Sequence, residues 1–177
     1  ADKKKMSEPL YSNDSISLWE FNEQSHFICA EFHTKANALD KHSTEGLLRA
    51  YDLCENHFDG IIIANDGMQF SAGVNLNMFL DMAVKKQWKH INSFLNQFQQ
   101  ACKQLRYANF PVIAAPSGLA IGGGYEVVAQ TDYVVAHSNS VLGLVEPLVG
   151  LIPAGGGCKE MLRRWSGDFR AKEDPFY

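Results

Sequence analysis

Three successive glycines and a carboxylate lie close together in the stretch AIGGGYEVVAQTD, which begins at Ala120. Glycine in a helix interior costs on the order of 1 kcal/mol relative to alanine, so the bare backbone needs a reason. If a helix begins near Gly122, Gly123 and Glu126 share one face because they are three positions apart. Free N–H groups at a helix start can bind developing negative charge. The stretch predicts a donor and a carboxylate in one pocket, although alone it is explained more simply by close helix–sheet packing with Glu126 in solvent.

Two further stretches offer a second donor and a second carboxylate. In MQFSAGVNLNMF, a turn of small residues at 71–73 precedes a helix expected to begin near Leu76, which leaves the N–H of Val74 available. In LGLVEPLVGLIPAGGG, Glu146 stands among aliphatic residues. Such a carboxylate is either turned toward water or held in a pocket where burial raises its pKa. Two carboxylates and two backbone donors could stabilise an enolate-like oxygen and move protons at the neighbouring carbons.

The elements that must position these residues alternate between strands and helices. Apolar and alternating runs predict strands at 16–21, 26–32, 60–65, 111–116 and 132–138, the first two as a hairpin and 60–65 buried on both faces. Helical spacing predicts helices at 42–58, with an N-cap at Asp40 or Ser43, and at 88–106, and a last helix within 155–165. Repeated strand-then-helix units indicate an α/β fold rather than a sandwich.

Composition and charge exclude several classes of function. The 177 residues are 46% hydrophobic with a formal net charge of −4, which suits one globular domain and gives no electrostatic reason to expect nucleic acid. We interpret the basic run Lys3–Lys5 as a solvated tail. No run approaches a membrane span. The cysteines lack metal-ligand spacing, which favours reduced thiols in the cytoplasm and no metal site; they are Cys29, Cys54, Cys102 and Cys158.

Two common enzyme motifs fit the chain poorly. The glycines at 118, 122, 123 and 124 do not give the G-x-G-x-x-G of a dinucleotide-binding fold. Ser117 lacks the flanking glycine of a G-x-S-x-G nucleophile elbow.

A family resemblance accounts for these motifs together. The segment 111–157, PVIAAPSGLAIGGGYEVVAQTDYVVAHSNSVLGLVEPLVGLIPAGGG, strongly resembles the signature region of the crotonase (enoyl-CoA hydratase/isomerase) superfamily, and NALD at 37–40 and FSAGVNL at 70–76 stand in the expected order. The residues of the segments FHTKANALD and GLVEPLVGLIP are most similar to the hydratase domain that is fused to an NAD-dependent 3-hydroxyacyl-CoA dehydrogenase in bacterial bifunctional β-oxidation proteins.

The resemblance implies a fold and a domain organisation. The fold is expected to be the α/β crotonase (ClpP-like) fold, a repeated ββα superhelix, truncated before its C-terminal helical region. Residues 1–13 are then a linker or tail remnant, and residues 14–177 a crotonase-like domain that is incomplete at its C-terminus.

The resemblance also implies roles for particular residues. Glu126 and Glu146 match the two catalytic glutamates, which position a water. The backbone N–H groups of Val74 and Gly123 match the oxyanion hole. Loop positions that contact coenzyme A are matched by Lys35, Ala36, Asn37 and Ala72. The chain departs from the family at Asn75, often aspartate, and at Val145, where many hydratases have proline, and neither change removes a catalytic group.

The expected activity is that of an enoyl-CoA hydratase, a lyase that adds water syn to trans-2-enoyl-CoA in fatty acid β-oxidation. The coenzyme A thioester is the substrate, and the domain needs no cofactor or metal, while NAD belongs to a suspected dehydrogenase domain. Retention of both glutamates favours hydration over a Δ3,Δ2-enoyl-CoA isomerase, which generally needs one. The isomerase and a non-catalytic acyl-CoA-binding or assembly fragment remain alternatives. With the C-terminal region present, a cytoplasmic homo-oligomer is expected.

Overall fold

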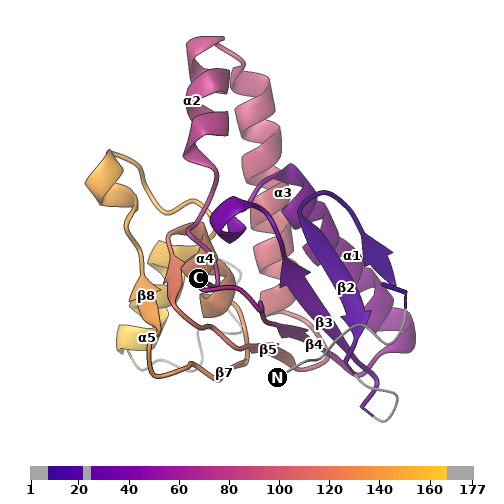
Figure 1. The fold of residues 1–177 in the computed structure, drawn as a ribbon. Helices are drawn as coiled ribbons and strands as arrows, with labels where there is room; N and C mark the ends of the chain where they lie inside the picture. The colour runs from indigo at the N-terminus through magenta and orange to yellow at the C-terminus, as the bar shows by residue number, and fades with distance from the viewer. Residues whose placement is uncertain (1–7, 22–24, 167–177) are drawn as a thin grey trace.

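A six-stranded sheet runs through the centre of the computed structural model, which describes residues 8–21 and 25–166 (Figure 1). The strand order is β1-β2-β3-β4-β5-β7. Pairing is antiparallel from β1 to β3 and parallel from β3 to β7. The strands are β1 (Tyr11–Ser12), β2 (Ile16–Glu20), β3 (Phe27–Phe32), β4 (Gly60–Ile63), β5 (Val112–Ala114) and β7 (Tyr133–Val134). A second, two-stranded parallel sheet joins β6 (Leu119–Ile121) to β8 (Val141–Gly143).

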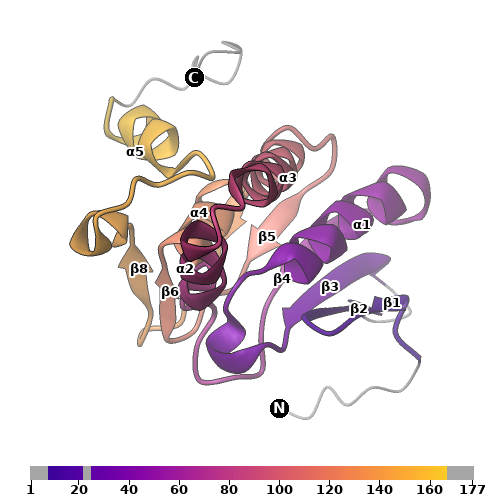
Figure 2. The same ribbon diagram turned by 90° about the horizontal axis from the view of Figure 1, so that it is seen from above.

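Helices α1 (Lys41–His57) and α3 (Trp88–Arg106) pack side by side over one face of the large sheet (Figures 1 and 2). Helix α2 (Leu76–Val84) pairs with the start of α3, and the two project away from the sheet (Figure 1). The short helix α4 (Gly123–Ala129) contacts β6 and α5 (Gly157–Ser166). Two 3-10 helices, η1 (Lys35–Asn37) and η2 (Glu146–Val149), complete the described elements.

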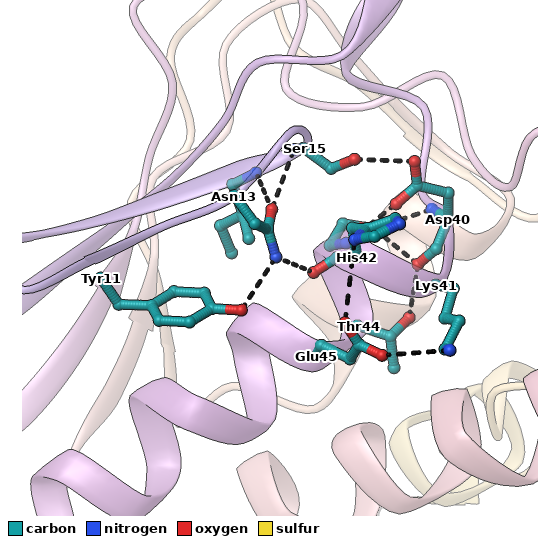
Figure 3. A network of polar contacts seen from close by, with 10 residues as sticks. Tyr11, Asn13, Ser15, Asp40, Lys41, His42, Thr44 and Glu45 are labelled. Carbon is teal, nitrogen blue, oxygen red and sulfur yellow. Dashed lines mark hydrogen bonds and ion pairs between the residues drawn. The ribbon is translucent and has the colours of Figure 1, made fainter.

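Helix α1 begins with a polar network that ties it to the N-terminal hairpin (Figure 3). Asp40 is its N-cap: the carboxylate accepts from Ser43 N at 2.8 Å, and Ser43 Oγ accepts from Asp40 N at 2.7 Å, which forms a capping box. The second carboxylate oxygen accepts from Ser15 Oγ at 2.7 Å. Asn13 Nδ2 donates to His42 O at 2.9 Å. The start of α1, and with it the preceding η1 segment, is therefore fixed against β2.

The hydrophobic core lies between the large sheet and the pair α1 and α3. Side chains that are fully buried there come from β2, β3, β4 and both helices, and include Ile16, Leu18, Ile28, Ile61, Ile63, Leu47, Phe98 and Leu105. The expectation that the 60–65 strand is buried on both faces is wrong in part. Ile61 and Ile63 are 0% exposed, whereas Ile62, which points to the opposite face, is only partly buried.

Several predicted elements lie where the periodicity places them. The helix predicted at 88–106 has those bounds, and the helix expected near Gly122 begins at Gly123. Trp88, the first residue of the apolar stripe, is nevertheless 61% exposed, because the first turns of α3 extend with α2 beyond the sheet. The strand predicted at 132–138 has only the two edge residues of β7.

The N-terminal segment 1–13 contributes to the sheet through β1, which pairs with β2, and Leu10 N donates to Leu18 O at 2.8 Å. The lysine run at 3–5 and the segment 167–177 lie outside the described residues.

Candidate active site

The candidate residues gather at the carboxyl edge of the parallel strands, which is where open α/β sheets bind ligands. They lie in the segments that follow β3, β4, β6 and β8. The turn at 71–73 is held from one side by the bonds from Ala72 N to Ala36 O (3.1 Å) and from Leu39 N to Gly73 O (2.8 Å). From the other side it exchanges bonds with β6: Ser71 N donates to Leu119 O, and Ile121 N donates to Ser71 O. Three segments distant in sequence therefore converge on one turn.

The two proposed donors are neighbours in this arrangement. Neither Val74 N nor Gly123 N donates to another residue within the described ranges. A Cβ placed on Gly123 would lie 3.5 Å from Val74 N and 2.8 Å from Val74 Cγ2, so the close approach requires glycine there. Gly122, the N-cap of α4, has φ +53°, which favours glycine because a side chain would be strained. The glycine run thus leaves two free backbone donors side by side.

Glu126 is buried, with 2% of its surface exposed. Its Oε1 accepts hydrogen bonds from Gly155 N and Gly157 N, each at 2.8 Å. The pKa of Glu126 is raised to about 7, chiefly by burial and also by the negative charge of Glu146, against the lowering effect of those two amides. The simpler interpretation, in which Glu126 points into solvent, is therefore wrong.

Close packing of glycine, the other half of that interpretation, is confirmed at Gly124. A Cβ there would lie 2.6 Å from Ser71 Cβ and 2.9 Å from Ser71 O. The glycine run therefore serves packing and leaves the amides free at the same time.

Glu146 begins η2 and is partly buried. Its Oε2 accepts from Val145 N at 2.9 Å, and its Oε1 lies 3.4 Å from the position that a Cβ on Gly122 would take. Glu126 N donates to Gly122 O at 2.9 Å, so both glutamates lie against Gly122, and the negative charge of Glu146 raises the pKa of Glu126. Glu146 therefore lies beside the N-cap residue of α4, and Glu126 lies in the first turn of that helix.

The residues expected to contact coenzyme A form a strained loop at the same edge. Ala36 and Asn37 have φ +56° and +51°, which is unusual for residues with a side chain. Asn37 is buried and its Nδ2 donates to Gln69 O at 2.8 Å, while Lys35 and Ala36 are exposed. The bond from Ala72 N to Ala36 O brings all four expected residues together, two positions from Val74.

The amides of Gly155 and Gly157 are site groups that the sequence analysis did not identify. They lie 29 and 31 residues from Glu126 and are brought to it only by the packing of α5 against α4. The signal that could have pointed to them is a second glycine run directly before a predicted helix, PAGGG.

Other features of the described residues do not contribute to this site. A groove of about 570 Å³ lies at the amino edge of β4 and β5, and its lining, which includes Cys54, Phe58 and Phe110, contains none of the candidate residues. Across the described ranges, no group of three His, Cys, Asp or Glu side chains could hold a metal ion. Likewise, none of the helices seen at 8–21 and 25–166 is both long and apolar enough to cross a bilayer.

Comparison with known proteins gives one family. The family model described as enoyl-CoA hydratase/isomerase matches residues 26–173. The chain is 35% identical over 152 residues to a Bacillus subtilis (strain 168) protein named "Probable 3-hydroxyacyl-CoA dehydrogenase", covering 86% of this chain and 19% of the relative. A relative from Rickettsia prowazekii (strain Madrid E), named for a fatty acid oxidation complex trifunctional enzyme, is 32% identical over 92% of this chain and 22% of its own. This chain thus spans about a fifth of either relative.

A solved structure shares the same fold. The enoyl-CoA hydratase of Polaromonas sp. JS666 superposes with a TM-score of 0.76 at 26% identity, over 84% of this chain and 58% of that one.

Proposed function

Because the chain belongs to the enoyl-CoA hydratase/isomerase family and has its α/β crotonase fold, we propose that the site at the start of α4 hydrates trans-2-enoyl-CoA thioesters. One observation carries the proposal: two carboxylates coupled through charge lie beside two neighbouring backbone amides that have no acceptor among the described residues. Hydration of a conjugated thioester needs these groups, since negative charge develops on the carbonyl oxygen while two protons move.

In this proposal the thioester oxygen accepts hydrogen bonds from Val74 N and Gly123 N. Water held between Glu126 and Glu146 adds its oxygen to the β carbon. One carboxylate takes the proton that the water loses, and a carboxylic acid gives a proton to the α carbon. Glu126 suits this work at neutral pH because its pKa of about 7 makes both protonation states available.

The coenzyme A part of the substrate is proposed to lie against Lys35, Ala36, Asn37 and Ala72. Their loop is supported by the turn that carries Val74, so contact with the nucleotide end and orientation of the thioester would be linked. Lys35 is exposed and free to approach a phosphate.

The test is hydration of crotonyl-CoA by the full-length natural polypeptide, followed through the loss of the conjugated enoyl-thioester absorbance. We expect Glu126→Gln and Glu146→Gln each to lower kcat by roughly 10²- to 10⁴-fold, the usual contribution of a positioned acid or base. Glu55→Gln, which changes an exposed glutamate of α1, is the matched control and should leave turnover unchanged.

Other outcomes of this test would favour one of the two alternative functions. Conversion of 3-enoyl-CoA to the conjugated isomer by the Glu146→Gln variant, with no hydration by the wild type, would favour the Δ3,Δ2-enoyl-CoA isomerase. Binding of coenzyme A without turnover would favour a non-catalytic acyl-CoA-binding or assembly module.

We further propose that this chain is the hydratase domain of a longer β-oxidation enzyme, with residues 14–177 as the crotonase-like part and residues 1–13 as the segment that links it to the rest and adds β1 to its sheet. The small share of the relatives that it spans and the dehydrogenase name of the first relative support this organisation. NAD would then serve the other domain. Assembly of the whole protein as a cytoplasmic homo-oligomer belongs to the same proposal, and gel filtration of the full-length protein tests it.

A further inference from the structure

The turn that holds Glu126 is itself anchored by two helices. Residues Ala154–Gly157 supply both amides to the carboxylate. Gln99 of α3 donates to Ala154 O at 2.8 Å, and Gln130, directly after α4, donates to Gly155 O at 3.3 Å. Glu160 N donates to Gly156 O at 3.0 Å, which joins the turn to the first turn of α5. The position of α5 therefore decides where the two amides lie.

A buried ion pair joins α5 to the end of α3. Glu160 is 0% exposed, and Arg106, the last residue of α3, is also buried. Arg106 Nε lies 3.5 Å from Glu160 Oε1. Lys159 Nζ lies 3.1 Å from the same oxygen, and Arg163 Nε donates to Oε2 at 2.9 Å. Burial raises the pKa of Glu160, but the bonds from Arg163 and Lys159 and the charge of Arg106 outweigh it, so the net pKa lies below its usual range.

Such a pair is weak evidence for stability, because removing two charges from water often costs as much as their attraction returns. Burial of both side chains nevertheless keeps their charges together across the α3–α5 boundary, although the 3.5 Å contact gives Glu160 Oε1 no hydrogen bond. Glu160 lies only four positions after Gly156 and its N–H bonds to Gly156 O, so the constraint is passed directly to the turn. We propose that the Arg106–Glu160 ion pair positions the amides of Gly155 and Gly157, and through them the carboxylate of Glu126. The inference rests on the proposed function, because it assigns both residues a positioning role in hydration.

Few other groups could mediate an effect on Glu126. Glu146 of η2 and the Cys102 thiol of α3 are the titratable side chains coupled to it by charge. Burial strongly raises the pKa of Cys102, so that thiol stays neutral near pH 7. From α5, Lys159 and Glu160 act on Cys102. The hydrogen bonds of the turn are thus the direct route from the ion pair to Glu126.

The main test is the pH profile of kcat/KM for crotonyl-CoA with Glu160→Gln in the full-length protein. The two amide bonds lower the pKa of Glu126, so weakening them raises it and moves the acidic limb to higher pH. We expect kcat at pH 7 to fall about tenfold, as small misplacements of catalytic groups do, while KM changes less than about twofold. Glu45→Gln, which breaks the exposed Lys41–Glu45 pair of α1, is the control and should leave the profile unchanged.

Three further variants keep the test decisive if Glu160→Gln fails to fold. Gln99→Leu removes only the bond to Ala154 O from an exposed position and should move the acidic limb in the same direction by a smaller amount. Arg106→Lys keeps the cation and should restore most of the kcat that Arg106→Met loses. Folded variants whose acidic limb stays in place would overturn the proposal.

A readout that does not need turnover separates this inference from the proposed function. Carboxyl ¹³C NMR titration, with the Glu126 signal assigned through Glu126→Gln, should give a higher pKa for Glu126 in Arg106→Met and in Gln99→Leu than in the wild type. An unchanged titration would overturn the positioning role, whatever reaction the site catalyses. A raised pKa in a protein without hydratase activity would uphold the positioning role and reject the proposed function alone.

Discussion

The buried position of Glu126 disfavours the ionised form of its carboxylate. In the folded protein the pKa of Glu126 is raised to about 7 from 4.5, the ordinary value for glutamate. Between these two values the folded state keeps a proton that the unfolded state has lost, so the free energy of unfolding falls as pH rises through this range. One pKa unit corresponds to about 1.4 kcal/mol, so the ionised carboxylate costs the fold about 3 kcal/mol above pH 7.

This cost gives a prediction for Glu126→Gln. The amide oxygen can still accept from the two glycine amides, but the side chain cannot ionise. We expect the variant to be more stable than the wild type by up to about 3 kcal/mol at pH 8, and equally stable near pH 4, where both side chains are neutral. Urea unfolding at the two pH values measures it. An equal gain in the free energy of unfolding at both pH values would show that burial of the charged carboxylate is not the cause.

The glycine run predicts a second effect at the residue scale. In Gly124→Ala the new Cβ would lie 2.9 Å from the backbone oxygen of Ser71, which cannot move without disturbing the turn that carries Val74. We expect a loss of about 1–3 kcal/mol in the free energy of unfolding. Gly143→Ala, whose Cβ would meet nothing within 4 Å, is the matched control. Chemical denaturation compares them, and a Gly124→Ala variant as stable as its control would refute the packing argument.

Among the elements, α1 has the start with the most polar contacts. Asp40 caps the helix and also accepts from Ser15 Oγ (Figure 3). Asp40→Ala should cost about 1–2 kcal/mol, because a cap and a tie to β2 are lost together. Asp40→Asn keeps a capping oxygen and should cost clearly less. Thermal or urea unfolding of both variants checks the order, and an equal loss in the two would contradict it.

How far the sequence predicts these elements depends on the range of the interactions. Helix α3 repeats its apolar positions over five turns, so local spacing alone predicts its bounds. The three-residue strands β6 and β8 pair residues 22 positions apart, such as Leu119 and Val141, and carry no such pattern, so the sequence does not predict this sheet. In the site, Gly123 and Glu126 are three positions apart, so the sequence alone predicts that they share one face of a helix. The anchoring of Glu126 by Gly155 and Gly157 depends on how α5 packs, which no local pattern encodes.

At the scale of the whole molecule, the site exists only where three chain segments meet. Isolated bridges join Leu39 to Val74 and Ser71 to Ala120, so the loop after β3, the turn after β4 and strand β6 share one hydrogen-bonded unit. An acyl-CoA that touches the loop and whose thioester oxygen accepts hydrogen bonds from the two free amides would therefore hold all three segments at once.

Binding of an acyl-CoA should therefore change the amide exchange of all three segments together. With a saturated acyl-CoA such as butyryl-CoA added at about 100 times its dissociation constant, ligand linkage adds about 2.7 kcal/mol to the free energy of unfolding. We expect the segments 35–39, 72–76 and 119–124 to gain protection in hydrogen–deuterium exchange mass spectrometry beyond this common increase, since the bound ligand also suppresses their local opening. Segment 54–59 at the amino edge should show only the common increase. Protection confined to one of the three segments would mean that the loop, the turn and the α4 start do not form a single binding site.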